Sequence, residues 1–325
     1  MTDQKSLMAT GSIALDTLET PFGKSDDVLG GSASHFCLAA SHFIPTEIVG
    51  VVGTDFPDAY RELFQERGID TRYMDQKEGK TFSWHGQYTG PMEEAETLEI
   101  QMNVHEDFEA PFDSPGPERD MLFLGNISPE FQLDVLDRLG NEPPIVAADT
   151  MRLWIETAKQ SLTKLLKRLD LLFLNYEEAL LLADTENTLN AARRIREMGP
   201  ETVIVKKGEH GAISVSGDEI QAVPGYPLEQ ERDPTGAGDT FAAGVMSIVR
   251  REGNLSPDVI RTGMILGTIC GSFNVEHFGP EGMISLSEDQ FTERLRDYAS
   301  ISSIDDRFIE PIEELPFRTS PPGEK

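Results

Sequence analysis

The sequence has few cysteines and no long apolar stretch. Its two cysteines, Cys37 and Cys270, lie in apolar helix-like patterns, so we expect buried free thiols rather than a disulfide or a metal site. No apolar run is long enough to span a membrane. No charged and apolar leader opens the chain, since Asp3 and Lys5 lie within its first six residues. These absences predict a soluble, cytoplasmic protein with no membrane partner.

Basic residues are also scarce. The chain has 28 lysines and arginines against 57 acids, which gives a net charge of −29. Such a charge argues against nucleic acid as a partner, because a polyanion would be repelled. Any phosphate-bearing ligand must therefore meet local donors and a divalent cation. One hypothesis is that the acidic surface keeps the protein soluble in a salty cytoplasm; the alternative is an acidic protein of an ordinary cytoplasm.

Short apolar strands alternate with amphipathic helices along the chain. This order predicts an α/β fold with a mostly parallel sheet covered on both faces. Polar residues follow the strands, and ligands bind at the carboxyl ends of parallel strands. The predicted strands cover residues 47–53, 121–124, 145–148, 171–174 and 202–205, and a helix is predicted over 57–67.

Two stretches break this rhythm, residues 15–29 and 80–103. Both alternate polar and apolar residues without a helix between them, which predicts additional strands. Two sets of side chains should each share a strand face: Phe82, Trp84 and Tyr88 in one strand, and Leu98, Ile100 and Met102 in its partner. Core packing, a dimer contact and stacking on a substrate are all open for the aromatic face.

Two common nucleotide-binding motifs are missing. Gly23-Lys24-Ser25 and Gly79-Lys80-Thr81 resemble the end of a P-loop, but Leu18 and Met74 stand where its first glycine belongs. Residues 11–13 do not supply the G-x-G-x-x-G of a dinucleotide site. The chain is therefore neither a P-loop kinase nor a dinucleotide-dependent oxidoreductase.

The most informative segment is D-P-T-G-A-G-D-T-F-A-A-G, residues 233–244. Gly236 and Gly238 let successive amides turn toward one point, and a helix is predicted to follow from Thr240. A helix start binds phosphate or an oxyanion through its unpaired amides. Asp239 would repel phosphate, but it could take a proton from a hydroxyl while the amides hold the charge of a transferred phosphoryl group. The alternative is an N-capping aspartate after a glycine turn.

This segment resembles the C-terminal signature of the PfkB carbohydrate kinases, the ribokinase-like family, which phosphorylate a hydroxyl of a sugar or nucleoside. Gly11-Ser12-Ile13-Ala14-Leu15-Asp16 resembles the family's first strand, Gly30–His35 its Gly-Gly signature, and Asn175–Glu178 its N-x-x-E motif. The resemblance implies a three-layer α/β/α sandwich forming a single domain over residues 1–325. It also implies a small β-sheet lid from about residues 13–31 and 80–104. We expect an extended tail over 305–325.

The resemblance assigns a role to each matched residue. Asp239 is the expected general base, and the amides from Gly236 through Ala237 and Gly238 to Asp239 form the anion hole. The nucleotide, ATP, is expected near Lys206, Gly208 and Asn274, with Asn175 and Glu178 organising Mg²⁺ largely through water. Thr235 and the backbone of Asp233 match positions that bind a monovalent cation, such as potassium, in many members. Asn175 is also a candidate helix cap, with Glu178 completing a capping box.

The substrate side departs from the ribokinase pattern. Asp16 is expected to accept from sugar hydroxyls, Gly30 and Gly31 allow a close approach, and Asn126 follows a strand on the same side. His35 replaces the asparagine that ribokinase-type members carry, so the hydroxyl pattern cannot be copied; a solvent-facing helix residue is the alternative. Residues 149–154 loosely resemble the D-x-N-x-R segment of sugar-acid kinases, without its asparagine.

The sequence thus predicts an ATP- and Mg²⁺-dependent kinase acting on a small-molecule sugar or sugar derivative. A nucleoside kinase of the same family is the first alternative, and a non-catalytic sensor of sugars or nucleotides is the second. Asp239 argues against a sensor, because a repelling acid would not help a protein that only binds phosphate. Dimerisation through the lid is a further expectation.

Overall fold

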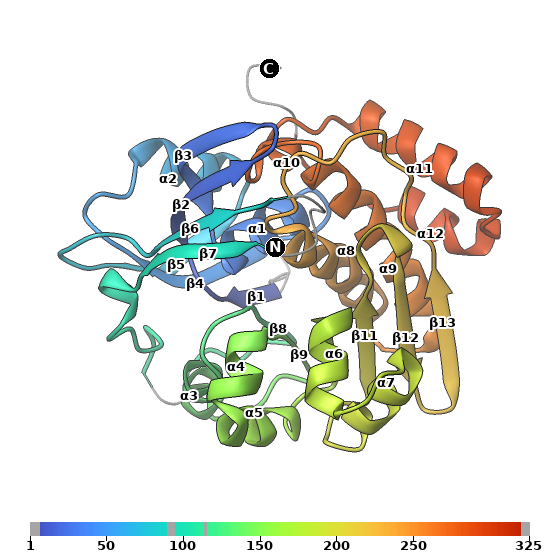
Figure 1. Cartoon of the computed structure of the whole chain (residues 1–325), viewed down its shortest axis with the longest axis horizontal. Helices are drawn as coiled ribbons and strands as arrows, with labels where there is room; N and C mark the ends of the chain where they lie inside the picture. Colours follow the sequence, from blue (N-terminus) through green and yellow to red (C-terminus); the bar gives the residue numbers. More distant parts are fainter. Residues whose placement is uncertain (1–6, 90–94, 114–115, 320–325) are drawn as a thin grey trace.

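The computed structural model describes residues 7–89, 95–113 and 116–319. Its main sheet has nine strands in the order β13-β12-β11-β10-β9-β8-β1-β4-β5 (Figure 1). Their bounds are β1 (Leu7–Thr10), β4 (Thr46–Val52), β5 (Asp70–Gln76), β8 (Met121–Leu124), β9 (Ile145–Asp149), β10 (Leu171–Asn175), β11 (Thr202–Lys206), β12 (Ala212–Ser216) and β13 (Glu219–Val223). The strands from β11 to β5 are parallel, and β12 and β13 add an antiparallel hairpin. All five strands predicted from apolar runs are confirmed.

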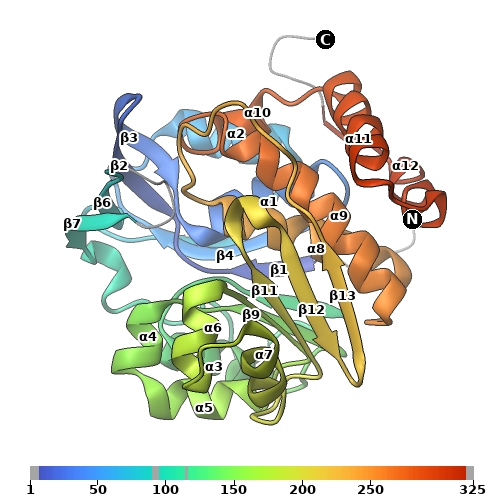
Figure 2. The same ribbon diagram turned by 45° about the vertical axis from the view of Figure 1, so that its right-hand side comes forward.

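Helices cover both faces of this sheet (Figures 1 and 2). One layer contains α1 (Ser32–Ser41), α2 (Asp58–Glu66), α8 (Ala237–Glu252), α9 (Pro257–Asn274), α10 (Glu281–Ile284), α11 (Glu288–Ser302) and α12 (Glu310–Glu313). The other contains α3 (Pro129–Leu139), α4 (Arg152–Thr157), α5 (Lys159–Leu166), α6 (Tyr176–Ala183) and α7 (Thr188–Arg196). In β10, Phe173 packs into the first core and Leu172 into the second, as alternation along a strand requires. The predicted three-layer sandwich is therefore confirmed.

A second, smaller sheet stands beside the main one, at the upper left of Figure 1. It has the order β3-β2-β6-β7, with bounds β2 (Ala14–Thr20), β3 (Gly23–Gly30), β6 (Ser83–Gln87) and β7 (Glu96–Gln101). Both predicted lid segments lie here, although residues 90–94 fall outside the described part. The expected first strand needs correction, because β1 ends at Thr10 and Asp16 belongs to β2.

The C-terminal segment is not an extended tail as expected. Asp306–Phe308 forms a 3₁₀ turn and α12 follows at once. Three apolar side chains of this segment are buried, those of Phe308, Ile309 and Ile312. The interval of three positions between Ile309 and Ile312 suits a helical turn better than an extended chain. Further on, the ring of Phe317 packs against His42, Phe43 and Phe291. Residues 320–325 lie outside the described part.

The cysteine prediction is confirmed. Cys37 and Cys270 are both buried free thiols. Across the described residues, every helix is too short or too polar to cross a lipid bilayer.

Candidate active site

The signature segment forms a tight turn that opens α8. Gly236 caps the helix in the left-handed conformation, with φ of 75°. A Cβ atom placed on Gly236 would lie 2.2 Å from Nδ1 of His35, so no larger residue fits there. Ala237 donates its amide to the carbonyl of Pro234 at 3.1 Å, which removes one of the four expected anion-hole donors. The next two amides of the first turn, those of Gly238 and Asp239, have no carbonyl partner inside the helix.

Asp239 lies in this first turn, where it is partly exposed. Burial of its carboxyl raises the pKa to about 7, and the charge of Asp149 adds to the rise against the opposing effect of Lys206. A carboxyl group with that pKa is divided between acid and base near neutral pH. It is therefore suited to accept a proton during a reaction.

Lys206, at the end of β11, reaches under the same turn. Its ammonium Nζ lies 2.5 Å from Oδ2 of Asp149, and a Cβ atom on Gly238 would lie 2.7 Å from that ammonium. Burial works to lower the pKa of Lys206, but the charges of Asp149, Glu178 and Asp239 outweigh it and raise the pKa. A permanent positive charge thus lies beside the anion-hole amides.

Asp149 contacts Lys206 at this site, although the sequence assigned it no role of its own. The sequence placed it as a polar residue after a strand and as the first residue of the segment that loosely resembles D-x-N-x-R. The structure shows it 5% exposed at the end of β9, with Oδ1 accepting the amide of Thr150 and Oδ2 facing Lys206. Its position at the carboxyl end of a central parallel strand was the available signal.

Asn175 and Glu178 form the predicted capping box at the start of α6. Oδ1 of Asn175 accepts the amide of Glu178 at 2.8 Å, and Oε2 of Glu178 accepts the amide of Asn175 at 2.7 Å. Burial raises the pKa of Glu178 to about 7, with the charge of Asp149 as the next cause. A hollow of about 100 Å³ adjoins the pair and is also lined by Arg152, Glu177 and Leu181.

These donors fit a magnesium ion held mainly by water and phosphate. Two carboxyl groups with pKa values raised to about 7 lie around one lysine, so the cluster carries uncompensated negative charge that a divalent cation would balance. Most of the carboxylate oxygens of Asp149 and Glu178 already accept hydrogen bonds. This matches an ion that keeps several waters. Across the described residues, no group of three or more histidine, cysteine or acidic side chains could hold a metal by itself.

On the other side of the turn, Asp16 is 3% exposed. Burial raises its pKa to about 7; the amide of Trp84, which donates to Oδ1 at 3.1 Å, opposes the rise, and the charge of Asp233 adds to it. A Cβ atom on Gly30 would lie 2.0 Å from Oδ2 of Asp16. Gly30 therefore makes room for this carboxyl group, and Gly31 follows with φ of 90°.

Three predicted site residues hold the turn from within. Asp233 is fully buried and accepts the amides of Thr235, at 2.9 Å, and Gly279, at 2.7 Å. Asn274, predicted beside the nucleotide, is also fully buried, and its Nδ2 donates to the carbonyl of Thr235 at 2.8 Å. The expectation that Asn274 contacts a nucleotide is therefore corrected, because α9 directs this amide into the protein.

His35 and Asn126 do not present free polar groups either. His35 is 2% exposed, lies against Gly236, and burial lowers its pKa to about 4. The side chain of Asn274 opposes this lowering, and the ring nitrogens have no other partner among the described residues, so a ligand could reach them only after their surroundings move. In Asn126, Oδ1 accepts from Nε1 of Trp154 at 2.9 Å and Nδ2 donates to the sulfur of Met151. Gly208, with φ of 54°, begins a short 3₁₀ turn after β11.

The three aromatic residues of the small sheet pack against protein groups. Phe82 lies 5.5 Å from the ring of His105, and the ring of Trp84 covers Gly86. The hydroxyl of Tyr88 lies 3.1 Å from Oγ1 of Thr235. Tyr88 thus connects the small sheet directly to the turn.

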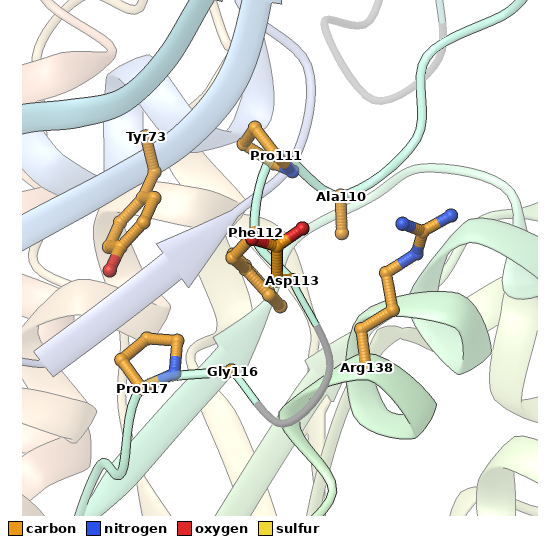
Figure 3. A pocket seen from close by; sticks show the side chains of 8 residues that line it. All are labelled: Tyr73, Ala110, Pro111, Phe112, Asp113, Gly116, Pro117 and Arg138. Carbon is orange, nitrogen blue, oxygen red and sulfur yellow. The ribbon is translucent and has the colours of Figure 1, made fainter.

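The largest hollow described lies elsewhere. It measures about 660 Å³ and is lined by Tyr73, Ala110–Asp113, Gly116, Pro117 and Arg138 (Figure 3). Gly116 and Pro117 precede β8, so this hollow is at the amino end of the sheet, away from the turn. Arg138 already pairs with Asp134 and Glu109. We therefore place the active site by its chemistry, at the opposite edge.

Comparison with known proteins identifies the family of this chain. A model of the pfkB family of carbohydrate kinases matches residues 25–284. The chain belongs to that family. The cytidine kinase of Thermococcus kodakarensis is 28% identical over 265 residues, which cover 79% of this chain and 93% of that enzyme.

Solved structures show the same fold. The nucleoside kinase of Methanocaldococcus jannaschii superposes with a TM-score of 0.72 at 20% identity, covering 90% of this chain and 99% of the other. A ribokinase-like protein of E. coli, solved with ATP and Mg²⁺, gives 0.70 at 19% identity, covering 91% and 99%. The pfkB-family protein is therefore a kinase with the ribokinase fold, and kinases of this fold use ATP with Mg²⁺.

Proposed function

We propose that this pfkB-family kinase transfers the γ-phosphoryl group of ATP to a hydroxyl group of a sugar or sugar derivative. The observation that carries the proposal is Asp239, a carboxyl group with pKa near 7 in the first turn of α8, beside the ammonium of Lys206. Phosphoryl transfer to an alcohol needs a base, main-chain donors and a positive charge close together. Asp239, the amides of the turn and the Lys206 ammonium are the groups proposed to supply them.

In the proposed reaction Asp239 accepts the proton of the substrate hydroxyl. The freed oxygen forms a bond to the γ-phosphorus while the bond from that phosphorus to the β-phosphate oxygen breaks, which releases ADP. The amides of Gly238 and Asp239 and the ammonium of Lys206 stabilise the charge on the transferred group. After transfer, the proton on Asp239 returns to solvent.

Asn175, Glu178 and Asp149 are the residues proposed to orient Mg²⁺ through water. When bound, the ion neutralises phosphate charge and fixes the geometry of the phosphate chain. Lys206 supplies local positive charge in a strongly acidic chain, and Gly208 provides backbone without a side chain where the nucleotide is proposed to lie.

Asp16 is the proposed substrate residue, with Gly30 and Gly31 beside it. It is 3% exposed, and the amide of Trp84, in the neighbouring strand β6, donates to its Oδ1. We propose that the sheet acts as a lid and that substrate entry requires its movement.

Among sugar derivatives, a nucleoside is the candidate substrate that the comparisons favour. The matched cytidine kinase aligns over 93% of its own length, which favours a nucleoside over a free sugar. A nucleoside presents a hydroxymethyl group on its ribose, so the same chemistry applies. The packing of Phe82, Trp84 and Tyr88 gives no additional support, because these rings contact protein in this structure.

The test is an assay with radiolabelled ATP against cytidine, other nucleosides, ribose, fructose, sugar acids and inositol. We expect phosphorylation of at least one compound, with nucleosides strongest. Nucleoside or sugar binding without phosphorylation of any compound would support a sensor and contradict the kinase proposal.

We also propose a homodimer through the small sheet. Leu98 and Ile100 of its edge strand β7 are 45% and 46% exposed, and Met102, just after the strand, is 40% exposed; such apolar exposure is unusual at the edge of a sheet. Light scattering should give a dimer mass for the native chain and a monomer mass for Ile100→Lys. A monomeric native chain at micromolar concentration contradicts this proposal.

A further inference from the structure

We propose that Thr235 is held by a buried amide and a tyrosine hydroxyl in this chain, in place of the monovalent cation that the family resemblance implies. The inference rests on the proposed function, because it concerns the turn that carries Asp239. It predicts a kinase whose turnover does not depend on potassium.

All three polar backbone and side-chain groups of Thr235 have partners within the protein. Its amide donates to Oδ1 of Asp233 at 2.9 Å, and its carbonyl accepts Nδ2 of Asn274 at 2.8 Å. Its hydroxyl lies 3.1 Å from the hydroxyl of Tyr88. The hydroxyl also hydrogen-bonds the carboxyl group of Asp233, so both oxygen atoms that a cation would use already have partners within the protein.

The orientation of the Asn274 amide follows from its two neighbours. A carbonyl only accepts, so the atom that faces Thr235 must be the nitrogen. The amide oxygen, Oδ1, then accepts from the hydroxyl of Thr240 at 3.3 Å. Asn274 is fully buried, so its NH₂ group directs positive partial charge at the Thr235 carbonyl and repels a cation there.

Direct hydrogen bonds also close the gap between this turn and the end of α9. The amides of Arg232 and Asp233 both donate to the carbonyl of Val275, at 2.7 Å and 3.2 Å. The amide of Gly279 donates to Oδ2 of Asp233 at 2.7 Å. Together with Asn274, these bonds connect the two segments without an ion between them.

The first test measures turnover of the full-length protein, with its best acceptor, in potassium, sodium or choline chloride at one ionic strength. Fixed ionic strength separates cation identity from general salt effects on an acidic chain. We expect kcat values within twofold of one another. A tenfold or larger activation by potassium overturns the inference while leaving the kinase proposal intact, whereas turnover of no acceptor contradicts the kinase proposal itself.

A second test uses Asn274→Ala, which frees the Thr235 carbonyl. We expect kcat to fall at least tenfold in choline and to recover several-fold in potassium, with far-ultraviolet circular dichroism unchanged. The matched control is Asn141→Ala, an exposed position outside the active site, which should keep native turnover in all three salts. Loss of turnover without potassium-dependent recovery shows that no cation position was replaced and overturns the inference.

A third test uses a crystal structure, so it depends neither on turnover nor on the Asn274→Ala variant. Crystals of the native protein grown in rubidium chloride should show no anomalous peak within about 3.2 Å of the Thr235 carbonyl oxygen, the range of a rubidium–oxygen contact. A peak there overturns the inference whatever the kinetics.

Discussion

Buried carboxylates have different partners at the two edges of the main sheet, the amino edge, where the parallel strands begin, and the carboxyl edge, where they end. At the amino edge, Glu47 is 1% exposed and accepts two hydrogen bonds from Arg119, at 2.7 Å and 2.8 Å. At the carboxyl edge, Glu178 and Asp239 share one lysine with Asp149, and burial raises the pKa of both Glu178 and Asp239 to about 7. Burial alone therefore does not mark a reactive acid; burial without a matching cation does.

Among the substitutions that test this comparison, Asp239→Asn should have the largest effect, which is on turnover. Asp239→Asn removes the proposed base but keeps the shape of the side chain. We expect kcat to fall by about 10³-fold or more, within the range of losses seen when an essential acid or base is removed. ATP binding, measured by calorimetry, should stay within a few-fold of native. Turnover near the native value would refute the assignment.

The same variant should gain stability at alkaline pH. The pKa of Asp239 is about 7 in the folded state and near 3.8 when unfolded, so folding favours its protonated form between these values. This contribution is complete below about pH 4 and is lost as pH rises through 7. Asp239→Asn should therefore be more stable than the native chain at pH 8, by roughly 1–3 kcal/mol, and equal at low pH. Chemical denaturation at pH 8 and pH 4 measures the difference, and a loss of stability at pH 8 contradicts the account.

Glu47→Gln should lower stability and leave turnover nearly unchanged, the reverse of what we expect for Asp239→Asn. It removes the charged partner that accepts two hydrogen bonds from the partly buried guanidinium of Arg119, which should cost about 2 kcal/mol of unfolding free energy. Because Glu47 lies at the far edge, kcat should stay within twofold of native. Glu142→Gln is a control, since it removes an exposed partner of Arg168 and should cost less than about 1 kcal/mol. A large loss of kcat in Glu47→Gln would mean that the two edges are not separate.

The smallest effect concerns the exposed acids, which belong to neither edge. With a net charge of −29, self-repulsion weakens the folded state and salt should screen it. We expect the thermal midpoint to rise by several degrees between 0.1 M and 2 M chloride, equally with potassium and sodium. A midpoint that does not rise with salt counts against adaptation to a salty cytoplasm.

Local patterns predicted much of this molecule. Apolar runs predicted five of the nine strands of the main sheet, and the glycine turn with Asp239 located the start of α8. The sequence could not show where side chains from distant elements meet. The contact between Lys206 and Asp149 joins two strands 57 positions apart, and Tyr88 reaches Thr235 across 147 positions. For the same reason the sequence did not show that the side chains of Asn274 and His35 are buried.

The most direct test of the central claim is the pH dependence of kcat/KM between pH 5 and 9 at constant ionic strength. A base with pKa near 7 gives a rate that falls tenfold per unit below pH 7 and levels off above it. Because burial also raises the pKa values of Glu178 and Asp16 to about 7, the profile is repeated with Glu178→Gln and with Asp16→Asn, and the inflection near pH 7 should persist in both. An inflection near pH 4, or a flat profile, would show that Asp239 is an ordinary carboxylate and contradict the proposed mechanism.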